Sequence, residues 1–165
     1  MLLLKLLGFL WLLPVTIPFW LLYVLPLLLR RDLRFVRWYD FAVAHFKVVS
    51  RHGWYARKWQ DWAGFSGPCC IITRSDVSAD PYQLHRTLVH EHRHCMQQLL
   101  FGPLFHPAYG LCTAVLWVYG TVTNADVHAY LDNPFEVDAR VAAGQPRRIE
   151  RKYWPHGRDD RLPWW

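Results

Sequence analysis

The sequence contains one run of residues whose types and spacing suit metal chemistry: His90-Glu91-His92-Arg93-His94. Two histidines at positions i and i+4 lie on the same face of a helix, so both imidazoles can bind one metal ion. Glu91 lies about 100° round the helix from His90, where a carboxylate can act as a general base without being a ligand. This is the H-E-x-x-H spacing. We therefore predict that His90 and His94 bind zinc and that Glu91 is catalytic.

A catalytic zinc ion needs a third protein ligand and an open position for water. We expect Glu136 to be that ligand, because the chain has only three Glu residues and this one opens a short helix after Asn133-Pro134. The alternative is a capping box in which Glu136 bonds the Asn133 backbone and pairs with Arg140 one turn on. Three further residues are candidate ligands in reserve: His128, His106 and Asp132.

Other residues near the motif have weaker signals. His92 projects into the apolar side of the predicted helix, so we expect a core or interface histidine there and not a ligand. Gln97 is placed to hold a ligand or a backbone group, or is an ordinary polar residue. Tyr130 or His128 is a candidate oxyanion donor, and Asp138 is a candidate partner for a ligating histidine.

The pattern His90-Glu91-x-x-His94-x-x-Gln97, followed by Tyr130 and by Asn133-Pro134-x-Glu136-x-x-Ala139, carries a resemblance over residues 65–145. It resembles the uncharacterised bacterial zincin-like domains of gluzincin type that pair HExxHxxQ with a downstream NPxE. The resemblance implies a zinc metallopeptidase in which Glu136 completes the metal site. Familiar gluzincins place an Asp four residues after the ligand Glu, whereas this chain has Arg140.

Clear end signals mark the helix that carries the motif. Asp80 can cap it, Pro81 suits its first turn, Gln83 completes a capping box, and Gly102-Pro103 ends it. We therefore predict a helix over 81–101. The β-branched run Cys69–Thr73 predicts a strand shortly before it.

The remaining elements follow from spacing and from turn residues. Phe35, Trp38, Tyr39 and Ala42 have helical spacing, so we predict a helix within 33–62, with a strand near His45–Val49. The apolar segment 110–122 predicts either a core helix that covers the site or a second membrane span. A last helix is expected from Asn133-Pro134 to Gly144.

The N-terminal segment is apolar, and no charged residue appears from 6 to 29. About 20 apolar residues suffice to cross a bilayer, so we predict a membrane anchor over 1–31. Prolines leave a re-entrant hairpin near Pro14–Pro18 open, and no cleavage site of a signal peptide follows. Lys5 precedes the segment and four arginines follow it by residue 37, which predicts a cytoplasmic C-terminal part. The resemblance to bacterial domains implies that the membrane is a bacterial inner membrane.

Charge and cysteine usage restrict the partners. The net charge of +6 is concentrated in arginines beside the apolar segment and in the tail, which favours anionic lipid headgroups. No recognition-helix, RRM or zinc-finger pattern accompanies it, so we do not expect nucleic acid. The four cysteines form no C-x-x-C pair, which is typical of free thiols in a reducing compartment.

Together these features predict a mostly helical α+β chain: a membrane anchor (1–31), a zincin-like minidomain with a short sheet (32–146) and a basic, Trp-rich tail (147–165). The predicted function is hydrolysis of peptide bonds in a peptide or protein substrate, through Glu91-assisted attack of a zinc-bound water. Two alternatives stay open. One is a non-catalytic zinc scaffold closed by a fourth side chain such as His128, and the other is a membrane protein whose histidines pair with carboxylates and bind no metal.

Overall fold

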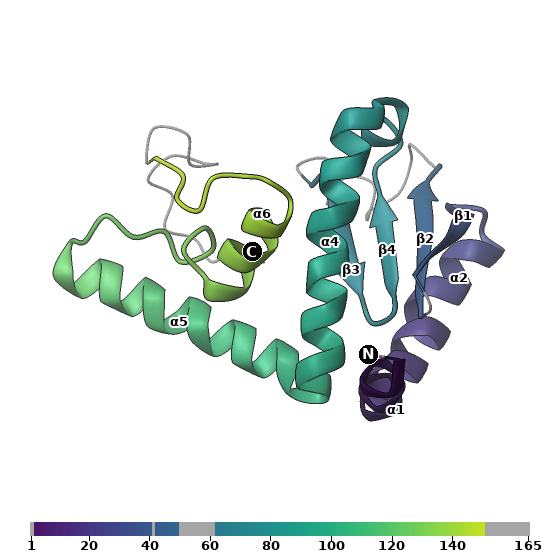
Figure 1. Cartoon of the computed structure of the whole chain (residues 1–165), viewed down its shortest axis with the longest axis horizontal. Helices are drawn as coiled ribbons and strands as arrows, with labels where there is room; N and C mark the ends of the chain where they lie inside the picture. Colours follow the sequence, from purple (N-terminus) through teal and green to yellow (C-terminus); the bar gives the residue numbers. More distant parts are fainter. Residues whose placement is uncertain (1, 41, 50–61, 151–165) are drawn as a thin grey trace. The chain divides into compact units, whose positions relative to one another are not determined.

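The computed structural model describes residues 2–40, 42–49 and 62–150, and the chain divides into two compact units, 1–103 and 104–165. The first unit contains the N-terminal helix, a four-stranded sheet and the helix with the histidine motif (Figure 1). The second contains the two C-terminal helices. The predicted class, a mostly helical α+β chain with a short sheet and an apolar N-terminal helix, is confirmed.

The N-terminal helix is continuous but irregular. It consists of α1 (Leu2–Phe19), a π-helical turn η1 (Trp20–Val24) and α2 (Leu25–Leu29). Pro14 and Pro18 lie inside α1, and Pro26 lies in the first turn of α2. Each proline removes one backbone hydrogen bond, and π-helical turns are a common cause of helix bending. In Figure 1, α1 is accordingly seen end on while α2 runs along the sheet.

The sheet is mixed, in the order β1-β2-β4-β3. Its strands are β1 (Leu33–Asp40), β2 (Val43–Val48), β3 (Gly64–Gly67) and β4 (Cys70–Thr73). Strands β2 and β4 are parallel, and the two edge strands pair antiparallel with them. All four residues of β4 are buried, as expected for a strand that is covered on both faces.

Helices cover both faces of this sheet. Val24 and Leu27 of the N-terminal helix share a core cluster with Phe46 and Ile72 on one face. On the other face, helix α4 (Pro81–Phe101) packs Leu88 and Cys95 against Val43 and Ile71. The motif helix is therefore fixed along its length by its apolar side, which leaves its other side for chemistry.

The ends of α4 follow the sequence signals. Asp80 caps the helix, since its carboxylate accepts hydrogen bonds from the backbone N–H groups of Tyr82 and Gln83 at 2.9 and 3.2 Å. Gly102 ends it with φ +57°, a left-handed conformation that favours glycine. The helix prediction over 81–101 is confirmed residue for residue. The predicted strands at Cys69–Thr73 and near His45–Val49 are confirmed as β4 and β2.

The predicted helix within 33–62 is wrong where the structure describes it, because residues 33–40 form β1. The pairing of β1 with β2 shifts register between Phe35 and Arg37 and again between Trp38 and Asp40. Such shifts interrupt the period-2 alternation of a strand and make the aromatic spacing resemble that of a helix. The part of this prediction at 50–61 lies outside the described residues.

The second unit contains α5 (Phe105–Thr123) and α6 (Pro134–Ala142). Helix α5 begins five residues before the predicted 110–122 segment, and α6 matches the predicted last helix. Asn133 caps α6, because its side-chain oxygen accepts from the backbone N–H of Phe135 at 3.0 Å. Most of the predicted tail, residues 151–165, lies outside the described part of the chain.

Two segments are long and apolar enough to cross a membrane by length and composition alone, 3–29 and 81–123. The first is the predicted anchor. It groups with residues 32–103 in the first compact unit, because it packs on the sheet and on α4.

Candidate metal centre

The histidine pair on α4 has the geometry of two metal ligands. The Nε2 atoms of His90 and His94 lie 3.2 Å apart, and their rings meet edge to face with centroids 4.8 Å apart. Two nitrogens that each lie about 2.0–2.1 Å from a tetrahedral zinc ion are about 3.3 Å from each other. The two imidazoles therefore converge on one point at a separation that suits zinc.

Gln97 orients one of these ligands. Its side-chain oxygen lies 2.8 Å from Nδ1 of His94, and an amide oxygen can only accept, so Nδ1 donates its proton. The lone pair of His94 then lies on Nε2, which faces His90. A hydrogen bond to the second ring nitrogen is the usual way in which proteins fix a metal-binding histidine. Of the two roles considered for Gln97, the structure supports the positioning role.

Glu91 is buried beside the edge strand β3. A Cβ atom added to Gly64 of β3 would lie 3.0 Å from Cγ of Glu91 and 2.6 Å from Cγ2 of Thr87. Only glycine therefore lets the strand approach this part of α4 so closely. The absence of a side chain at residue 64 leaves room for the Glu91 carboxylate next to the histidine pair.

Glu136 lies in the second unit, near the start of α6, and is buried there. The hydroxyl of Tyr109 on α5 donates to its Oε1 at 2.8 Å. Asn133, one turn earlier, donates from its side-chain nitrogen to the Tyr109 carbonyl at 3.1 Å and to the Thr113 hydroxyl at 2.8 Å. Contacts with α5 therefore hold both the carboxylate and the start of its helix.

The capping box considered as the alternative role of Glu136, with Arg140 as its ion-pair partner, differs from the observed contacts. Asn133 caps α6, while the Glu136 carboxylate accepts from Tyr109. Nη2 of the buried Arg140 donates to the carbonyls of Leu131 and Arg147, so this guanidinium supports the loop before α6 and the segment after it. Tyr109 is the residue that sequence reasoning missed. The sequence signal was faint, because Tyr109 is one of five hydroxyl-bearing residues on a largely apolar helix and no motif marks it out.

The three ligands predicted from the sequence are divided between the units: His90 and His94 converge in the first, and Glu136 is buried in the second. Two of the reserve candidates, His128 and Asp132, have structural contacts. Nδ1 of His128 accepts from the backbone N–H groups of Tyr130 and Leu131, and Asp132 accepts from the His128 backbone at 2.8 Å.

His92 takes a different position, as predicted. Its Nε2 lies 3.2 Å from the Asp40 carboxylate at the end of β1, and Lys5 of α1 donates to the same oxygen at 2.6 Å. Burial is the main reason that the pKa of His92 is lowered, and Asp40 opposes that shift. His92 therefore links α4 to α1 and to the sheet and stays outside the metal group.

Two buried titratable side chains of the first unit, His45 and Cys70, have structural roles in the sheet layer. Burial, assisted by Arg37, lowers the pKa of His45 to about 4, and its Nε2 lies 2.9 Å from the Thr73 hydroxyl. Burial raises the pKa of the Cys70 thiol, and all four cysteines are free. A neutral imidazole and a protonated thiol inside the sheet layer are structural groups.

No protein family, curated protein or solved structure matches the chain. The geometry of the described residues therefore carries the functional argument.

Proposed function

We propose that the chain is a zinc metallopeptidase with a zincin-like site, in which His90, His94 and Glu136 hold the metal ion and Glu91 is the general base. The convergence of the two Nε2 atoms, 3.2 Å apart beside a buried Glu91, is the observation that carries this proposal. Two imidazoles and one carboxylate are a common ligand set of catalytic zinc and leave a fourth position open.

The chemistry assigns a separate task to each side chain. Zinc at this position supplies Lewis acidity, which polarises a peptide carbonyl and makes water more acidic. Glu91 takes a proton from the attacking water as the new C–O bond forms, and then gives it to the leaving amine as the C–N bond breaks. Gln97 keeps the lone pair of His94 directed at the metal. Tyr130 and His128 remain candidate donors to the oxyanion.

The edge strand β3 offers a way to hold a peptide beside Glu91. The backbone N–H of Arg74 donates to the Ala63 carbonyl, so by antiparallel alternation Gly64 and Ser66 direct their backbone groups away from β4. The Gln98 side chain donates to the Ser66 carbonyl at 3.1 Å. The backbone groups of Gly64 are thus the ones next to Glu91, where an extended peptide can add to the sheet.

We further propose that the chain is attached to the bacterial inner membrane through its N-terminal segment, with the metal centre in the cytoplasm. The uncharged stretch from residue 6 to 29 supports the attachment, and the four arginines that follow by residue 37 suit the anionic surface of the cytoplasmic leaflet. The resemblance to bacterial domains supports the bacterial membrane.

The second candidate function is a zinc scaffold without catalysis. The buried position of Glu136 and its bond to Tyr109 suit a structural ligand equally well. A scaffold does not require the Glu91 carboxylate, however, whereas a peptidase does. A substitution of Glu91 therefore distinguishes the two functions.

The experiment compares Glu91→Gln with the wild type and with Glu150→Gln, the matched change at an exposed glutamate of the tail. The full-length chain is purified in detergent, and its zinc content and its cleavage of a quenched-fluorescence peptide library are measured. We expect Glu91→Gln to keep its zinc and to lose about 10²–10⁴-fold in turnover, the usual contribution of a general base. Wild-type chains that hold zinc but cleave no peptide, or a Glu91→Gln variant with full activity, would favour the scaffold.

A further inference from the structure

The N-terminal helix is packed sideways on the first unit along most of its length. Its buried residues Leu12, Thr16, Val24 and Leu27 follow helical spacing and form one stripe. Trp20, on the same side, donates from its indole nitrogen to the Pro68 carbonyl at 2.8 Å. The helix therefore contributes one face to the core of the unit.

The opposite face is apolar and exposed. The residues that are more than half exposed, in contrast to the buried stripe, include Leu3, Leu7, Leu10, Ile17, Leu21 and Leu22. Helices that pack on a soluble core normally carry polar residues on the side that faces water. Here no charged residue occurs between positions 6 and 29, so this face is unsuited to water.

Strand β1 runs back along the same helix. It begins at Leu33, which shares a core cluster with Leu27, and it ends at Asp40, which accepts a hydrogen bond from Lys5. If α1 and α2 crossed a bilayer, this edge strand would lie at the depth of the hydrocarbon, with the exposed side chains of Arg34 and Arg37. Open sheet edges and exposed charges are not stable there.

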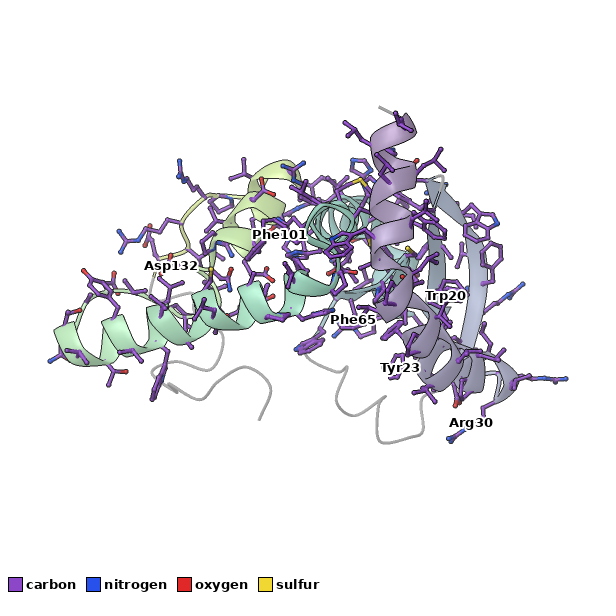
Figure 2. All side chains as sticks on the ribbon, turned by 90° about the horizontal axis from the view of Figure 1, so that it is seen from below. Trp20, Tyr23, Arg30, Phe65, Phe101 and Asp132 are labelled. Carbon is purple, nitrogen blue, oxygen red and sulfur yellow. The ribbon has the colours of Figure 1, made fainter. Side chains whose placement is uncertain are left out.

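We propose that the N-terminal helix lies in the plane of an anionic membrane surface, with its exposed apolar face among the acyl chains, and does not cross the bilayer. Amphipathic helices bind in this way through one apolar face, and here the other face is occupied by the core of the first unit. Figure 2 shows Trp20 and Tyr23 on η1 and Arg30 where the helix ends. Arg30, Arg31 and Arg34 are exposed at this end, where they can contact anionic headgroups.

The apolar face continues from α1 onto the end of the motif helix. Gly8 allows a close crossing, since a Cβ atom there would lie 2.6 Å from the Leu99 carbonyl oxygen. A hollow between the two helices is lined mainly by apolar side chains, among them Leu4, Leu7, Trp11, Met96, Leu99 and Leu100. His94 is five residues from Leu99, about 7.5 Å along the helix. If the chain is the proposed peptidase, its substrates would be cleaved close to the membrane surface. This step alone rests on the proposed function.

Topology mapping tests the proposal. One epitope tag is placed before Met1, and Ser75→Cys introduces a thiol in an exposed loop of the same unit. The native Cys69, Cys70 and Cys95 are buried, and the half-buried Cys112 is replaced by serine so that only the introduced thiol reports. Inside-out vesicles are treated with protease or with a membrane-impermeant maleimide. The in-plane helix predicts that the tag and the introduced thiol react from the same side. Reaction from opposite sides would mean a crossing helix and would overturn the proposal.

A second measurement tests what covers the apolar face. Full-length protein is mixed with vesicles of phosphatidylglycerol and phosphatidylcholine. We expect Leu22→Glu to weaken binding about tenfold or more and the matched change Tyr82→Glu, at an exposed residue of α4 away from this face, to alter it less than twofold. Replacing phosphatidylglycerol by phosphatidylcholine should also weaken binding. A wild-type chain that stays in the soluble fraction, as a dimer or with the face covered by its own second unit, would contradict the proposal. The metal plays no part in either measurement.

Discussion

The two halves of the proposed metal centre are held in different ways. His90 and His94 lie one turn apart on α4, so helix geometry places the two side chains together, and their Nε2 atoms lie 3.2 Å apart. Glu136 depends on a contact with Tyr109, 27 residues earlier and on another helix. The histidine half is thus local and is fixed wherever α4 forms, whereas the glutamate half requires the tertiary packing of the second unit. The comparison predicts different responses to substitution.

The largest effect is expected when the histidine half is broken. His94→Ala removes a proposed ligand and should weaken zinc binding by more than the roughly 10–100-fold that loss of a supporting residue costs. His92→Ala is the matched control on the same helix, since His92 contacts Asp40. Competition with a chromogenic chelator measures both affinities. Equal losses in the two variants would show that the assignment of ligand and non-ligand faces on α4 is wrong.

A smaller effect, on turnover alone, is expected at the close contact between β3 and α4. Gly64→Ala would bring a Cβ atom within 2.6 Å of Cγ2 of Thr87 and 3.0 Å of Cγ of Glu91, and so displace the proposed general base. Small displacements of catalytic groups cost about 10²-fold in rate, while zinc content should not change. Gly110→Ala, where nothing lies within 4 Å of the added atom, is the control. Steady-state kinetics with zinc analysis would decide, and an unchanged rate in Gly64→Ala would exclude the proposed role of this contact.

The smallest effects are expected when each half loses its supporting residue. Gln97→Leu and Tyr109→Phe should each weaken zinc binding about 10–100-fold. Tyr109→Phe should cost more, because helix geometry still directs the histidines whereas Glu136 loses its donor. Tyr119→Phe, at an exposed position of α5, serves as control. If Gln97→Leu weakened zinc binding more than Tyr109→Phe, the histidine half would depend more on its supporting contact than the glutamate half does, contrary to this comparison.

The sequence predicted the histidine half well because its signals are local. Asp80, Pro81 and Gly102 mark the ends of α4, and the motif spacing then places both histidines on one face of the helix. Strand β1 was mistaken for a helix because shifts in its pairing with β2 disturb the alternation that identifies strands. The Tyr109 contact could not be predicted, since no spacing rule joins two residues on different helices. The sideways packing of the N-terminal helix also depends on contacts distant in sequence, such as Lys5 with Asp40.

Zinc content of the wild type and of Glu136→Ala tests the central claim most directly, since it examines the metal and its third ligand together. Glu150→Ala is the control, as Glu91, Glu136 and Glu150 are the only glutamates of the chain. We predict about one zinc per chain at neutral pH in the wild type and in Glu150→Ala, and loss of that zinc from Glu136→Ala after dialysis against a weak chelator. A wild type that contains much less than one zinc per chain, or a Glu136→Ala variant that retains it in full, would contradict the account.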